Sequence, residues 1–192
     1  MIMKKNETGF SSVDKPWLKY YPENIEKLNV PQVSMTKLLY DSCQEYLDNI
    51  ALSYFNTKKT YRQYIKDIEN YYASLRHMNP KKSEVILTML PNIPESRELV
   101  YSAVSCNCRV YPLLPMISPA ELDRIISENE VRTIVLFDGF YEKYKSVLEA
   151  NSNLKNIIGT DGTYSLSSVM SFLSKIKNKS KSEISKSKKY IP

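Results

Sequence analysis

The residues best suited to chemistry in this sequence are two cysteines in a Cys-x-Cys arrangement, Cys106 and Cys108. Thiolates at this spacing can bind zinc or form a redox pair, but a tetrahedral zinc site needs about two more ligands. Cys43 and His77 are the only other cysteine or histidine side chains in the chain. Because Cys106 also falls on the apolar face of a predicted helix, we interpret the pair as small buried hydrophobic residues, with redox pairing as the alternative.

Phosphate binding would require a glycine-rich loop, and the sequence has only 4 glycines. Neither G-x-G-x-x-G nor G-x-x-x-x-G-K-[ST] occurs in it. The stretch Gly159–Gly162 follows a predicted strand and could form an anion-binding turn. Asp161 would repel a phosphate group in this position, so an ordinary turn is the favoured interpretation.

His77 is the single histidine and lies at the end of a predicted helix, next to Arg76. A Ser-His-Asp arrangement would have to use it, but the chain has no G-x-S-x-G nucleophile motif. The favoured role of His77 is an interaction with the carboxyl end of its helix. We therefore predict no catalytic, cofactor-binding or metal-binding residue in this chain.

An α/β body over residues 34–173 is expected to position these side chains. Apolar runs predict strands, and apolar residues three and four positions apart predict helices between them. The predicted strands cover residues 50–55, 84–90, 109–114, 132–137 and 154–159, with a turn at residues 57–59. This alternation predicts a mostly parallel sheet flanked by helices.

Several predicted helices carry start signals. Thr60 with Gln63 forms a capping box, and Asn92 with Glu95 can form another. The strongest signal is Ser118, because Pro119 and Glu121 follow it. Further helices are predicted over residues 140–150 and 166–176.

Two flanking segments are predicted to lie outside the body. Residues 1–33 contain three prolines and several aromatic residues and are expected to form an extended arm that docks through those aromatics. Residues 174–192 are rich in lysine and serine and are expected to form a flexible tail. A weak electrostatic role of this tail toward RNA, phosphate or lipid stays open.

The charge of the chain is concentrated in that tail. The formal net charge is +6, and residues 175–189 account for it with seven lysines and one glutamate. The rest of the chain has no net charge, which argues against a specific nucleic-acid-binding domain. No apolar run has the roughly 20 residues of a membrane span, and no secretory signal is present. Together with 3 cysteines, an odd number, this predicts a cytoplasmic protein with reduced thiols.

Several short strings resemble the amino-terminal region of adenylate-forming (AMP-binding) enzymes, the superfamily of acyl-CoA synthetases, peptide-synthetase adenylation domains and luciferases. Their order and spacing carry the resemblance over residues 8–170. The strings lie at residues 8–10 (TGF), 14–21 (DKPWLKYY), 50–52 (IAL), 60–64 (TYRQY), 90–95 (LPNIPE), 110–113 (VYPL) and 118–122 (SPAEL).

The resemblance implies an enzyme that uses ATP and Mg²⁺ to convert a carboxylic acid into an acyl-AMP, and then transfers the acyl group to a thiol of CoA or a carrier protein. In this family the ATP-binding loop and the catalytic lysine lie further downstream. We therefore expect an amino-terminal fragment that is inactive alone and needs a second chain carrying the missing half, or a full-length synthetase, as partner. The alternatives are a non-enzymatic interaction module and a decayed gene product.

Overall fold

The structure is a computed structural model that describes residues 8–22, 30–166 and 183–191. The chain divides into two compact units, Met1–Val33 and Ser34–Pro192. Among the described residues, no helix is both long and apolar enough to cross a bilayer.

The amino-terminal unit contains two short helical segments, α1 (Ser11–Asp14) and the 3₁₀ helix η1 (Pro16–Tyr20). The Asp14 carboxylate accepts hydrogen bonds of 2.9 Å from the backbone N–H groups of Thr8 and Gly9. Within the described part, this segment therefore differs from the extended conformation that its prolines suggested. Pro16 starts η1 rather than breaking a helix, because its fixed φ suits the first helical position.

The larger unit begins with α2 (Met35–Cys43), the 3₁₀ helix η3 (Gln44–Tyr46), and a hairpin of β1 (Ile50–Tyr54) and β2 (Thr57–Thr60). The two strands pair antiparallel. The turn predicted at residues 57–59 is wrong: these residues belong to β2, and the chain turns earlier. Phe55 and Asn56 make this turn with φ angles of 43° and 62°.

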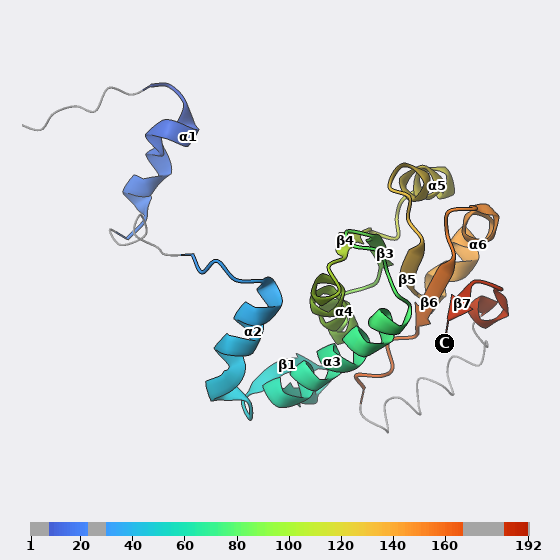
Figure 1. The fold of residues 1–192 in the computed structure, drawn as a ribbon, viewed down its shortest axis with the longest axis horizontal. Coiled ribbons are helices and arrows are strands. Elements are labelled where there is room, and N and C mark those ends of the chain that lie inside the picture. The colour runs from blue at the N-terminus through green and yellow to red at the C-terminus, as the bar shows by residue number, and fades with distance from the viewer. Residues whose placement is uncertain (1–7, 23–29, 167–182, 192) are drawn as a thin grey trace, which may run out of the picture. The chain divides into compact units, whose positions relative to one another are not determined.

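A five-stranded sheet forms the centre of this unit, in the order β4-β3-β5-β6-β7 (Figure 1). All neighbouring strands in it are parallel, as predicted. The strands are β3 (Val85–Met89), β4 (Arg109–Pro112), β5 (Thr133–Phe137), β6 (Asn156–Thr160) and β7 (Tyr190–Ile191). The connecting helices are α3 (Tyr61–His77), α4 (Pro94–Ser105), α5 (Pro119–Glu128), the 3₁₀ helix η4 (Asp138–Phe140) and α6 (Tyr141–Ala150).

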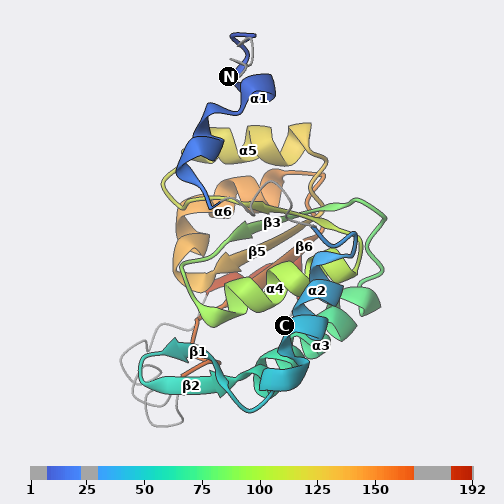
Figure 2. The same ribbon diagram turned by 90° about the vertical axis from the view of Figure 1, so that its left-hand side faces the viewer.

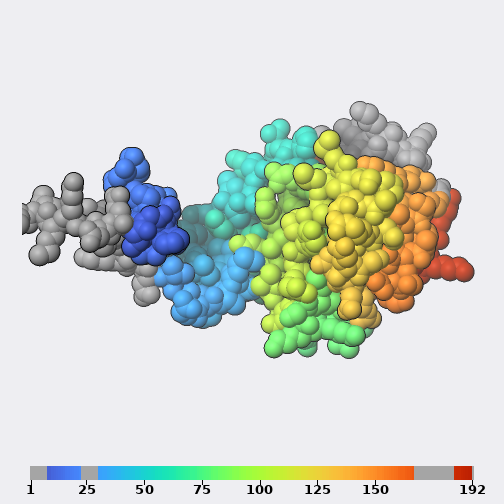
Figure 3. Space-filling model, turned by 90° about the horizontal axis from the view of Figure 1, so that it is seen from above, coloured from blue at the N-terminus to red at the C-terminus, as the bar shows by residue number. Residues whose placement is uncertain are grey.

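Helices cover both faces of the sheet (Figure 2). Alternate residues of β3 point to opposite faces, so that Leu87 packs with α5 and α6 while Ile86 packs with α3 and α4. In the space-filling view, α5 and α6 lie side by side as the yellow and orange surfaces (Figure 3). Because β3 and β5 are covered on both faces, nearly every residue in them is buried, and each reads as a continuous apolar run.

Two of the predicted helix starts are confirmed and one is wrong. The Thr60–Gln63 capping box is present at the start of α3, and Ser118 caps α5 by accepting a hydrogen bond from Glu121 N. Asn92 does not cap α4, because Ile93 occupies the N-cap position and Pro94 starts the helix.

Residues 183–191 differ from the flexible tail expected over residues 174–192. They form the 3₁₀ helix η5 (Glu183–Lys186) and β7, which extends the sheet beside β6. Ile184 is buried in the main core. Lys189 Nζ donates three hydrogen bonds to backbone carbonyls at the end of α6, at 2.7 Å to Leu148 O, 2.9 Å to Glu149 O and 2.8 Å to Asn151 O. The helix predicted over residues 166–176 falls almost entirely outside the described residues.

Candidate functional site at the carboxyl edge of the sheet

The connections of the sheet reverse direction between β3 and β5. From β3 the chain runs through α4 to β4 on one side, whereas from β5 it runs through α6 to β6 on the other side. Open α/β sheets bind ligands outside the carboxyl ends of their strands at such a point. The candidate site is therefore formed by the segments that follow β3, β5 and β6.

A pocket of about 340 Å³ lies at this edge, and we call it the carboxyl-edge pocket. Its walls come from the end of the β1–β2 hairpin and from the three segments named above. The lining residues are Tyr54, Phe55, Pro91, Asn92, Ile93, Phe137, Asp161, Gly162, Thr163 and Leu166. Most of these side chains are apolar or aromatic, so the pocket suits an apolar group held among few polar contacts.

Close packing shapes this pocket at two places. The rings of Tyr54 and Phe55 meet edge to face, with centroids 4.8 Å apart and an interplanar angle of 86°. Gly162 has a φ of +69°, and a Cβ added there would lie 3.3 Å from the ring of Phe137. Both the backbone angle and the close approach favour glycine at this position.

The turn after β6 is closed by a carboxylate. Asp161 Oδ1 accepts hydrogen bonds from the Thr163 backbone N–H at 2.9 Å and from its hydroxyl at 2.7 Å. The Gly162 N–H donates to Thr160 Oγ1 at 3.1 Å. In the Gly159–Gly162 stretch, Gly159 and Thr160 still belong to β6, and the turn begins at Asp161, whose carboxylate takes an N–H group that an anion would need.

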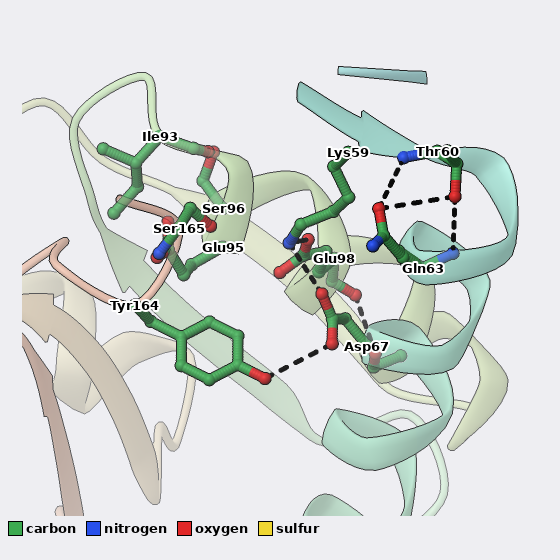
Figure 4. A network of polar contacts seen from close by, with 11 residues as sticks. Lys59, Thr60, Gln63, Asp67, Ile93, Glu95, Ser96, Glu98, Tyr164 and Ser165 are labelled. Atoms are coloured by element: carbon green, nitrogen blue, oxygen red, sulfur yellow. Dashed lines mark hydrogen bonds and ion pairs between the residues drawn. The ribbon is translucent and has the colours of Figure 1, made fainter. Parts of the chain in front are cut away.

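A network of charged side chains lies next to the pocket and joins β2, α3 and α4 (Figure 4). Lys59 Nζ lies 2.6 Å from Asp67 Oδ2 and 2.5 Å from Glu98 Oε1. The side chain of Glu98 is 0% exposed, and those of Lys59 and Asp67 are each 14% exposed. We call these three residues, with Glu95 and Tyr164, the Lys59 network.

This network also holds the segment that forms one wall of the pocket. The Tyr164 hydroxyl donates a hydrogen bond to Asp67 Oδ1 at 3.3 Å, and Glu95 Oε1 accepts one from the Ser165 backbone N–H at 3.0 Å (Figure 4). Asp67 lies 97 residues before Tyr164 in the chain. The network therefore links the hairpin and helices to the segment after β6.

Burial and ion pairing compete in setting the pKa values of the network. Burial raises the pKa of Glu98 to about 6, because desolvation of the carboxylate outweighs the attraction of Lys59. Burial alone would lower the pKa of Lys59, but hydrogen bonds with Asp67 and Glu98 outweigh it and raise the pKa above its ordinary value. Lys59 therefore stays an ammonium group, whereas Glu98 can bind a proton under mildly acidic conditions.

The network contains more negatively charged groups than positively charged ones. It contains three carboxylates, Asp67, Glu95 and Glu98, against the single ammonium of Lys59. Glu95 Oε2, Glu98 Oε2 and Ser165 Oγ are buried and have no hydrogen-bond partner within the described part of the chain. Excess negative charge of this kind repels phosphate groups. Over the same residues, no three His, Cys, Asp or Glu side chains are grouped in a way that could hold a metal ion.

The cysteines and the histidine lie apart from this site. Cys43, Cys106 and Cys108 are all buried with free thiols, in agreement with their interpretation as small hydrophobic residues. Burial raises the pKa of Cys108 to about 11, so its thiol is protonated near neutral pH. His77 occupies the last turn of α3, beside Arg76.

Sequence patterns did not indicate the Lys59 network. Lys59 lies in the polar string Thr57–Thr60, and its two partners lie 8 and 39 positions away along the chain. One signal was present, since Glu98 precedes the apolar Leu99 and occupies the buried side of α4 together with Glu95 and Ser102. A carboxylate on an otherwise buried helix face implies a cationic partner.

A sequence model of the AMP-binding enzyme family matches residues 39–190, which is most of the chain. A long-chain-fatty-acid–CoA ligase from Bacillus subtilis (strain 168) is 27% identical over 130 residues. That match covers 67% of this chain and 23% of the relative.

Solved structures with this fold include further CoA and acid ligases. An anthranilate CoA ligase in complex with anthranoyl-AMP has a TM-score of 0.64 at 14% identity, covering 71% of this chain and 26% of the other. A long-chain-fatty-acid-CoA ligase from Archaeoglobus fulgidus has a TM-score of 0.61 at 18% identity, covering 72% and 29%. The chain thus spans about a quarter of the length of these relatives. The sequence match and the parallel sheet together show that this chain belongs to the AMP-binding enzyme family.

Proposed function

We propose that this chain supplies the amino-terminal scaffold of an acid–thiol ligase. The complete enzyme would join a carboxylic acid to ATP, releasing pyrophosphate and forming an acyl-AMP. It would then transfer the acyl group to the sulfur of CoA or a carrier protein and release AMP. Family membership and the kinds of relatives that share the fold support this reaction class.

The second part of the proposal is that this chain has no ligase activity by itself. ATP and Mg²⁺ are implied by the family, but the carboxyl-edge residues do not fit a triphosphate. The observation that carries this point is the excess of carboxylates: Lys59 is already paired with two of them, and Asp161 closes the turn after β6. A triphosphate needs cations and free N–H groups instead.

A pyrophosphate exchange assay tests this proposal. The purified chain is incubated with ATP, Mg²⁺, labelled pyrophosphate and a series of carboxylic acids that includes long-chain fatty acids. We expect label in ATP only when a second polypeptide that carries the remaining regions of the family enzyme is added. Exchange by this chain alone would overturn the claim of inactivity, and no exchange by the mixture would count against the scaffold role.

A non-enzymatic interaction module is the second candidate. An apolar hollow of about 630 Å³ beside α2 favours it, because Leu38, Tyr46 and Ile50 line the hollow and are about half exposed. Exposed apolar surface of this kind marks protein interaction sites. Recovery of one stoichiometric partner in a pull-down would support this role, whereas a monodisperse monomer without partners would weaken it.

A further inference from the structure

A row of cationic side chains lies at the opposite end of the sheet from the candidate site. They belong to the segments that lead into four adjacent strands. Arg109 starts β4, Lys81 and Lys82 precede β3, Arg132 precedes β5, and Lys155 precedes β6. The amino ends of parallel strands meet at one edge, so the topology gathers residues that are up to 74 positions apart.

These five cations line one groove of about 540 Å³, which we call the amino-edge groove. Glu84 and Glu130 are its only acidic residues, which leaves a formal excess of three positive charges. The remaining lining residues are polar or small: Ser83, Val85, Ser127, Asn129, Ser152 and Asn153. This contrasts with the body of the chain, which is neutral without its lysine-rich tail.

Internal contacts hold part of this groove in place. Arg109 Nε donates to Ser83 O at 3.0 Å, and Lys155 Nζ donates to Ser152 O at 2.6 Å. Arg132 pairs with Glu84 at 3.4 Å. The side chains of Lys81 and Lys82 are exposed and have no partner among the described residues. The groove therefore combines positioned cations with two unpaired ammonium groups.

The spacing of the cations favours an extended ligand over a single small anion. Neighbouring strands lie about 4.8 Å apart, so cations entering four strands spread over roughly 15 Å. One phosphate or carboxylate group can contact only part of such a row. A segment with several negative charges can contact all of it.

We infer that the amino-edge groove binds an acidic segment of a partner protein. Carboxylates presented by a helix at four-residue spacing recur every ~6 Å, which is close to the spacing of the strands. Nucleic acid is a poorer fit, because none of the lining residues is aromatic and no base could stack on an aromatic ring there.

A fluorescein-labelled peptide of ten glutamates provides the probe, with binding followed by anisotropy at low salt. The test variant is K81E/K82E of the full chain. The control is K58E/K66E, which makes the same change of charge on two exposed lysines outside the groove. Circular dichroism verifies that both variants are folded.

We expect the wild-type chain and the control to bind the peptide within twofold of each other, and K81E/K82E to bind at least tenfold more weakly. Binding should also weaken as salt is raised. An equal loss of affinity for the peptide in both variants, or no binding of the peptide by the wild-type chain, would overturn the inference. Tighter binding of a ten-nucleotide single-stranded RNA, with loss in K81E/K82E, would replace the protein partner with a nucleic acid. None of these outcomes depends on ligase activity, so they are separate from the proposed function.

Discussion

Lys59 Nζ and Glu98 Oε1 lie 2.5 Å apart in the interior of the protein, and they join β2 to α4 across 39 residues of sequence. Buried charges of this kind are costly to remove from water and are tolerated because they are paired. The pair therefore stabilises the fold only as a unit, and replacing one member should be worse than replacing both.

Replacing Lys59 tests this relationship. Lys59→Met leaves the carboxylates of Asp67 and Glu98 without their cation, and we expect the free energy of unfolding to fall by about 3 kcal/mol. Urea unfolding followed by circular dichroism measures this loss. Lys66→Met, on the exposed side of α3, should change the same quantity by less than about 0.5 kcal/mol. The double variant K59M/E98Q should recover part of the loss, and no recovery would contradict the pairing.

The pH dependence of stability should report on Glu98. Its pKa is raised from 4.5 to about 6 in the folded protein, so the folded state holds this proton more tightly than the unfolded chain. The stability contributed by this proton is fully present below pH 4.5 and is lost as pH rises toward 6. The shift corresponds to about 2 kcal/mol.

Glu98→Gln removes this titration and serves as the reference. Between pH 4 and pH 7, we expect the wild-type protein to lose about 2 kcal/mol of stability relative to the variant. The same carboxylate is also faced by Lys59, Asp67, Glu95 and Tyr71. These four residues are present in both proteins, so we expect them to change the free energy of unfolding with pH about equally in the wild type and the variant. If the difference in free energy of unfolding between the wild type and Glu98→Gln stays constant with pH, Glu98 does not titrate in this range.

The secondary structure was largely predictable because its signals are local. The capping box of Thr60 and Gln63 and the serine cap at Ser118 each depend on residues within one helical turn. The strands β3 and β5 are short apolar runs in the sequence. This is the pattern expected of strands in a sheet that is covered on both faces.

The features that were missed depend on distant contacts or on unusual backbone angles. The turn at Phe55 and Asn56 uses positive φ angles, which a phenylalanine seldom adopts. The strand β7 follows a lysine-rich stretch, and among the described residues there Ile184 is buried and Tyr190 packs against the main core. The Lys59 network has one sequence signal, Glu98 on the buried side of α4, and this signal does not identify Lys59 as its partner.

Gly162 should be sensitive to substitution. Its φ of +69° is unfavourable for a side chain, and a Cβ would approach Phe137 at 3.3 Å. We expect Gly162→Ala to lower the free energy of unfolding by about 1–2 kcal/mol, measured in urea. Asparagine tolerates positive φ better, so Gly162→Asn should cost less than alanine. If Gly162→Asn loses more stability than Gly162→Ala, the backbone angle does not determine the loss.

Lys189 should hold the carboxyl-terminal strand in place. Its ammonium group donates to three carbonyls at the end of α6, and its own carbonyl accepts from Ile157 N at 2.8 Å. We expect Lys189→Met to speed hydrogen exchange in residues 183–191 and at Ile157, with a loss of about 1 kcal/mol in stability. Exchange measured by mass spectrometry on Lys188→Met, an exposed neighbour, should match the wild type. Unchanged exchange in both variants would refute this role.

The β1–β2 hairpin is a separate sheet from the five-stranded one, yet it contributes Tyr54 and Phe55 to the carboxyl-edge pocket. Lys59 lies on the same hairpin and ties it to α3 and α4. The contacts of Lys59 with Asp67 and Glu98 therefore fix where this aromatic wall stands relative to α3 and α4, through strands that do not pair with the central sheet.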